Sequence, residues 1–166
     1  MIENVIAWVL ENAFLVLFAL SCLFGIVGFV RRANAKKGSV WEPLTFWMLL
    51  LFVGFGGIYG FVTHGFMGEI AAKAIGWADS PFQWEVAVAN LVFGVLGVLA
   101  AFSRSRGFRF ATIVGFSVWF WGDAAGHVYQ MITADDFAPG NAGTWFWLDV
   151  VTPAIMLVLH AANRKS

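Results

Sequence analysis

Long apolar stretches, separated by short polar or basic turns, run along the whole chain. Five of them are long enough to cross a bilayer as helices, which takes about 20 mostly apolar residues each. We expect these spans at about residues 5–30, 44–66, 81–102, 110–131 and 145–162. The pattern therefore predicts an all-α integral membrane protein, a bundle of five transmembrane helices that forms a single domain over residues 1–166.

The helical pattern of the second span continues beyond residue 66. A straight helix over 44–75 would be about 48 Å long, which is too much for one crossing. We expect a break near residues 65–68, followed by a short amphipathic helix at the membrane interface that Trp77 anchors. Ser80 and Gln83 form a capping-box pattern with Pro81 at the first helical position, and they predict where the third span begins.

Composition supports a membrane protein. The chain is 60% hydrophobic and 12% charged, whereas soluble domains are about 45–50% apolar and about 25% charged. The single cysteine, Cys22, cannot form an intramolecular disulfide. We find no motif for phosphate binding, for a hydrolase nucleophile or for nucleic-acid binding. The expected partners are the lipid bilayer, a small cation or metal and, through the glycine-rich helix faces, a second copy or another membrane protein.

Lys and Arg residues are distributed unevenly between the two sides of the predicted membrane. Nine of the ten follow spans one, three and five, and only Lys73 falls on the other side. Cytoplasmic loops carry the excess of positive charge, so we expect the N-terminus outside, the C-terminus inside and a multi-pass protein of the cytoplasmic membrane. The nine are Arg31, Arg32, Lys36, Lys37, Arg104, Arg106, Arg109, Arg164 and Lys165.

The fourth span carries a polar stripe. Thr112, Trp119, Asp123, His127 and Gln130 fall within about 80° of one another on a helix. An aspartate in the middle of a spanning helix costs about 2.5–3.5 kcal/mol on insertion, so such residues usually face protein or water and often have a function.

The predicted orientation places further polar residues at the same depth. His64 and His127 come near the outer ends of their spans, and Glu85 and Asp149 near the outer beginnings of theirs. The sequence therefore predicts one pocket that opens outward. It should be formed by His64, Gln83, Glu85, Asn90, Trp119, Asp123, His127, Gln130 and Asp149.

Three interpretations of this pocket stay open. In the first, it binds a divalent transition metal such as Zn, Mn, Fe or Cu for uptake, sensing or redox use. His64, Asp123 and His127 would be ligands, and Glu85 and Asp149 further ligands or orienting groups.

In the second interpretation, His64 and His127 ligate a b-type haem between them. In the third, the polar stripe is only a packing network, and the protein is a non-catalytic structural or interaction subunit. The sequence does not identify a catalytic residue under any of the three.

Four segments resemble those of a family of small prokaryotic polytopic membrane proteins with no assigned activity. The resemblance covers about residues 44–160 and implies a prokaryotic membrane protein without implying a reaction. The segments are residues 76–85 (GWADSPFQWE), 89–97 (ANLVFGVLG), 122–130 (GDAAGHVYQ) and 138–143 (APGNAG).

Overall fold

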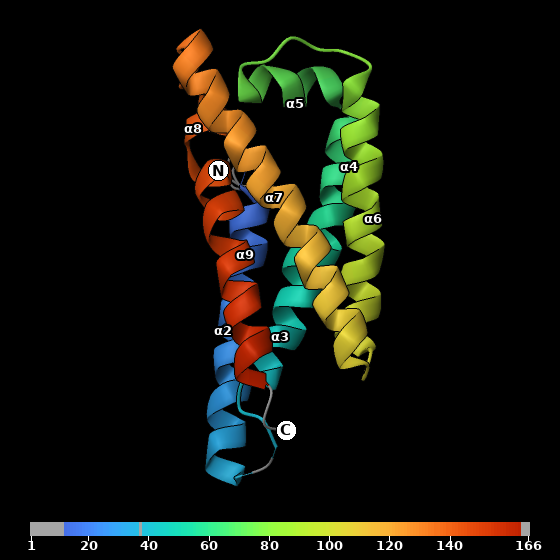
Figure 1. Ribbon diagram of the computed structural model, residues 1–166, viewed down its shortest axis with the longest axis vertical. Helices are drawn as coiled ribbons and strands as arrows, with labels where there is room; N and C mark the ends of the chain where they lie inside the picture. Colours follow the sequence, from blue (N-terminus) through green and yellow to red (C-terminus); the bar gives the residue numbers. More distant parts are fainter. Residues whose placement is uncertain (1–11, 37, 164–166) are drawn as a thin grey trace, which may run out of the picture.

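The computed structural model describes residues 12–36 and 38–163, and every regular element in them is a helix (Figure 1). The predicted all-α fold is therefore confirmed. The elements are α2 (Ala13–Ala35), α3 (Glu42–Trp47), the π-helix η1 (Met48–Phe55), α4 (Gly56–Phe66), α5 (Gly68–Ile75), α6 (Phe82–Phe102), α7 (Arg106–Ala134), α8 (Pro139–Ala142) and α9 (Thr144–Ala162).

Four helical stretches in the described part are long and apolar enough to cross a membrane. They are α2, the continuous run Glu42–Phe66, α6 and the run Pro139–Ala162. The predicted fourth span corresponds to α7, which has 29 residues but is not among the four, because its polar stripe lowers its hydropathy. Residues 5–11 of the predicted first span lie outside the described residues, and α2 continues past residue 30 to Ala35.

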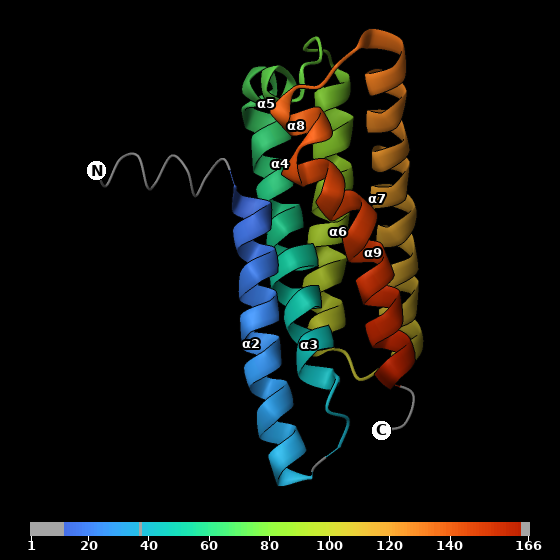
Figure 2. The same ribbon diagram turned by 90° about the vertical axis from the view of Figure 1, so that its left-hand side faces the viewer.

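The long helices lie side by side along one axis, and α7 crosses the bundle obliquely (Figures 1 and 2). The α5 helix lies across one end, close to α8, and we call this the α5 end. The opposite end, where α3 begins and α9 finishes, is the α3 end. The break expected after the second span falls at Met67, between α4 and α5.

Glycines bring the second and third apolar stretches into close contact. A Cβ at Gly57 would lie 2.5 Å from the backbone nitrogen of Gly94, and one at Gly97 would lie 2.6 Å from that of Gly54. No side chain fits at such separations, so only glycine allows this approach. This glycine-rich face is thus buried within the chain, between α6 and the run formed by η1 and α4.

The hydrophobic core lies between this contact and the α7–α9 pair. Phe52 of η1 makes edge-to-face contacts with Phe116 and Phe120 of α7. Met48 and Met156 are also fully buried in this cluster. The middle of the bundle is therefore filled by apolar side chains, which support the polar residues above them at the α5 end.

The predicted capping box of α6 does not form. The N-cap residue is Pro81, and no side chain caps the helix. The amide of Gln83 donates to the carbonyl of Ser80 at 3.0 Å instead. The Gln83 side chain is unavailable because it hydrogen-bonds His64. The prediction of a capping box was wrong because the Gln83 side chain forms a hydrogen bond between helices instead of capping its own helix.

Candidate functional site

A pocket of about 170 Å³ lies at the α5 end, between α4, α6, α7 and α9, with the α5–α6 loop over it. Seven of the nine residues that the sequence pointed to line it. From different helices, the fold brings together His64, Gln83, Asn90, Trp119, Asp123, His127 and Asp149.

The other two residues of the predicted set lie elsewhere. Glu85 is exposed in the first turn of α6, since it is two residues from Gln83 and hence about 200° away around the helix. Gln130 shares the face of Asp123 on α7, but it is almost two turns nearer the α5 end and does not line the pocket.

Aromatic side chains form much of the remaining wall. Phe120 also belongs to the core cluster, so the pocket rests directly on the core. Trp77 comes from the α5–α6 loop, where the sequence predicted only an interfacial anchor. The aromatic lining residues are Phe14, Trp77, Phe82, Trp119, Phe120 and Trp145.

His127 is held through one ring nitrogen by Asn141 of α8. Its Nδ1 lies 2.6 Å from Asn141 Oδ1. The amide nitrogen of Asn141 donates to the carbonyls of Asp136, at 2.8 Å, and of His127, at 3.3 Å. Because this fixes the amide with its oxygen towards the ring, Nδ1 must carry the proton that it donates. Asn141 is fully buried, and sequence analysis missed it because it lies between the predicted spans 110–131 and 145–162, where the sequence predicts a loop instead of α8.

The second ring nitrogen of His127 faces a carboxylate. Its Nε2 lies 3.6 Å from Asp149 Oδ2, and the ring stacks near Trp77 with centroids 5.7 Å apart. With the Nδ1 proton fixed, a neutral imidazole would present a lone pair at Nε2 to a second acceptor. Two acceptors face each other stably only when a proton, a cation or a water lies between them.

His64 repeats this arrangement on α4. Its Nδ1 lies 2.7 Å from Gln83 Oε1, so an amide side chain again takes one ring nitrogen. Asp123, in contrast, is half-buried and makes no hydrogen bond or ion pair with any described residue. The pocket therefore contains one carboxylate that nothing in this part of the chain neutralises.

The acidic side chains of the pocket have no basic partner of the Lys or Arg type there, since none of the described residues that line the pocket is Lys or Arg. In residues 12–36 and 38–163, no three side chains of His, Cys, Asp or Glu lie close enough together to hold a metal ion. Four of the five predicted metal ligands thus share a pocket without converging on one point, and the fifth, Glu85, lies outside it.

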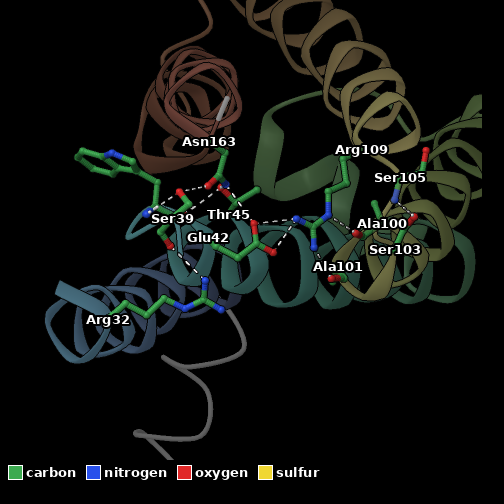
Figure 3. Close-up of polar contacts among 11 residues, drawn as sticks. Arg32, Ser39, Glu42, Thr45, Ala100, Ala101, Ser103, Ser105, Arg109 and Asn163 are labelled. Atoms are coloured by element: carbon green, nitrogen blue, oxygen red, sulfur yellow. Dashed lines mark hydrogen bonds and ion pairs between the residues drawn. The ribbon is translucent and has the colours of Figure 1, made fainter. Parts of the chain in front are cut away.

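A second polar cluster lies at the α3 end (Figure 3). Arg109 of α7 binds both carboxylate oxygens of Glu42, at 2.7 and 2.9 Å. It also donates to the carbonyls of Ala100 and Ala101, both at 2.9 Å, in the last turn of α6, where carbonyls lack the usual helical donor. From the sequence, Arg109 is interpreted only as one of the basic residues that indicate the cytoplasmic side.

Asn163 extends this cluster to the end of α9. Its amide nitrogen donates to Thr45 Oγ1 at 2.8 Å and to Glu42 Oε2 at 3.2 Å, and its oxygen accepts from the Ser39 hydroxyl. The cluster ties together α3, α6, α7 and the end of α9, which is a structural role.

The four membrane-length apolar helices and the bundle around an ionisable pocket are features of polytopic membrane proteins. The family model of DUF6790, a family of unknown function, matches residues 11–166, and the chain belongs to this family. No curated protein and no solved structure shows a significant match. The expectation of a family without an assigned activity is therefore confirmed.

Proposed function

We propose that the protein spans a prokaryotic cytoplasmic membrane five times and binds a small cation in an outward-opening pocket. The observation that carries this proposal is the acidic lining of the pocket. Asp123 and Asp149 line it together, and no Lys or Arg of the described chain does.

The arrangement of the bundle supports α7 as a further membrane span, in addition to the four stretches that are apolar enough by composition. At 1.5 Å per residue, its 29 residues extend about 43 Å, and it packs against α9 and α6 along the bundle. A polar stripe is tolerated in a spanning helix when it faces protein, and that of α7 faces the pocket.

The distribution of charge supports the proposed orientation. Among the described residues, Lys and Arg lie at the α3 end, with the exception of Lys73 on α5. Positive charge favours the cytoplasmic side, so the α5 end, where the pocket lies, faces outward.

Binding at the outer face fits the pocket better than conduction does. Below it, the core is filled by Phe52, Phe116, Met48 and Met156, which provide no hydrophilic route towards the α3 end. We therefore favour sensing, or the capture step of uptake, over a channel.

The volume of the pocket bears on the alternative of a haem. A cavity of about 150 Å³ holds one benzene-sized molecule, and the pocket is close to that size at about 170 Å³. A macrocycle between His64 and His127 would require the helices to separate. A cation with a few waters fits without such movement.

The test is the melting temperature of detergent-purified protein with Mn²⁺, Zn²⁺, K⁺ or tetramethylammonium, together with elemental analysis of the purified sample. A ligand that binds only the folded state raises the melting temperature. We expect at least one cation to do so for the wild type and for Glu85→Gln, which removes an exposed carboxylate outside the pocket, but not for Asp123→Asn. If no cation changes the melting temperature and no metal co-purifies, the proposal is wrong, and an interaction subunit is the better interpretation.

A further inference from the structure

We infer that the cation is a small organic ammonium ion with methyl groups, rather than a metal ion. This inference rests on the proposed function and specifies its ligand. The structural reason is the combination, in one pocket, of two carboxylates with six aromatic side chains.

The wall of the pocket suits an ion that carries both charge and apolar surface. A cation near the face of Trp, Tyr or Phe is attracted by the ring quadrupole, and aromatic sites of this kind recognise quaternary ammonium groups. Three of the lining side chains are Trp77, Trp119 and Trp145, and Trp is the strongest of the three aromatic types in this interaction.

The two carboxylates of the pocket can have different roles. Asp149 already faces the His127 ring across 3.6 Å, whereas Asp123 has no partner among the described residues. Asp123 is therefore the natural counterion of an added positive charge. An ammonium ion needs one such counterion at a distance and no inner coordination shell.

A transition metal makes the opposite demand. It needs several lone pairs that converge at about 2.0–2.3 Å from one point, and no such group of three is present in the described part of the chain. It would also leave the aromatic walls in contact with the waters that complete its shell.

Size agrees with this choice. A cavity of about 150 Å³ accepts a molecule of benzene size, about six heavy atoms, and this pocket measures about 170 Å³. Tetramethylammonium has five heavy atoms and fits this limit.

The experiment measures binding of tetramethylammonium to the full-length protein in detergent, by calorimetric titration and by melting temperature. Its neutral counterpart of the same shape, tert-butanol, and Mn²⁺ and Zn²⁺ are titrated in parallel. We expect tetramethylammonium to bind, and we expect tert-butanol and the metals to leave the melting temperature unchanged.

Two tryptophans on α9 provide a matched pair of variants. Trp145 lines the pocket, and Trp147, two residues on, is 59% exposed on the outside of the bundle. Trp145→Leu should weaken tetramethylammonium binding about thirtyfold, which corresponds to the roughly 2 kcal/mol of a desolvated cation–π contact. Trp147→Leu should not change it, and Trp145→Phe, which keeps an aromatic face, should retain most of it even if Trp145→Leu folds poorly.

The outcomes separate this inference from the proposed function. If Mn²⁺ or Zn²⁺ binds in a manner that depends on Asp123 and His127 while tetramethylammonium does not bind, the ammonium inference is overturned and the cation pocket stands. If tert-butanol binds as well as tetramethylammonium, the ammonium inference is overturned, because positive charge then plays no part in binding. If tetramethylammonium, Mn²⁺, Zn²⁺ and K⁺ all fail to bind, both the ammonium inference and the proposed function are overturned. Equal loss of binding in the two leucine variants would also overturn the ammonium inference, because it would show that the pocket wall is not involved.

Discussion

The two polar clusters of this bundle are built from similar groups and satisfy them differently. At the α3 end, Arg109 and Glu42 pair at 2.7 Å, and the arginine also binds two backbone carbonyls. At the α5 end, Asp123 has no partner in the described chain, and Asp149 faces an imidazole at a distance longer than a hydrogen bond. A polar network whose members are all satisfied fixes the helices that it joins, whereas a partly satisfied one is costly until something else binds. The difference separates a structural cluster from a candidate binding site.

The largest expected effect is at the α3 end. Arg109→Ala should leave the Glu42 carboxylate without its cation and the Ala101 carbonyl of α6 without its side-chain donor, whereas the Ala100 carbonyl keeps the amide of Ser103 as a donor. Breaking a buried ion pair costs about 3–5 kcal/mol. The side chains here are 14% and 28% exposed, so we expect a loss of about 2–3 kcal/mol in the free energy of unfolding.

Denaturant unfolding of the detergent-purified protein measures this loss. Arg104→Ala is the matched control, because Arg104 is exposed at the same end and should change stability little. Equal effects of the two substitutions would mean that the Arg109–Glu42 ion pair makes no specific contribution to the free energy of unfolding.

A smaller effect is expected where the pocket is anchored to α8. Asn141→Ala removes the acceptor of His127 Nδ1 and the donor to the Asp136 carbonyl. A buried group left without its partner costs about 1–3 kcal/mol, and we expect a value near the middle of that range. The variant should also weaken cation binding, since the His127 ring is no longer oriented.

Asn34→Ala is the control for this substitution, because Asn34 is exposed on α2, and it should change neither stability nor binding. A destabilised Asn141→Ala protein that binds the cation as well as the wild type would contradict a positioning role for Asn141.

The smallest expected effect is a gain in stability, from a substitution of Asp123. It is the most direct test of the difference between the two polar clusters. Without added cations, Asp123→Asn replaces an unpaired carboxylate by a neutral amide of the same shape. Removing such a charge should raise the free energy of unfolding by about 1 kcal/mol. The control is Asp135→Asn, at an exposed position with φ of 52°, where asparagine is equally suited to the left-handed conformation. If Asp123→Asn is destabilising in cation-free buffer, then Asp123 has a structural role like that of Arg109.

Much of the pocket could be predicted because, in a regular helix, each residue adds a fixed rise along the axis and a fixed rotation around it. Counting residues from the ends of their spans predicts that His64, Asp123, His127 and Asp149 lie in the outer third of the membrane, with Asp123 one turn deeper than His127. The structure brings all four into one pocket. Glu85 has the depth expected of a pocket residue, but it lies on another face of α6. The depth of a residue does not determine which way its side chain points around the helix.

Residues outside the long helices could not be placed in this way. Asn141 and Trp77 lie in connections between spans, where no period relates sequence to position. Gln83 fitted a local rule for helix starts, but His64, 19 residues away, takes its side chain. In each case a tertiary contact determines where the side chain lies, and patterns in a single sequence do not encode such contacts.

The composition of α7 has a consequence for the biogenesis of the protein. In the five-span topology that we propose, α7 is the span with the poorest partition into lipid, because Asp123 alone opposes insertion by about 2.5–3.5 kcal/mol. Its favourable contacts are mainly with α9, which is synthesised after it. We therefore expect the nascent α7 to stay at the translocon, or at the membrane surface, until its C-terminal neighbour emerges, so that the last two spans enter the bilayer as one antiparallel hairpin.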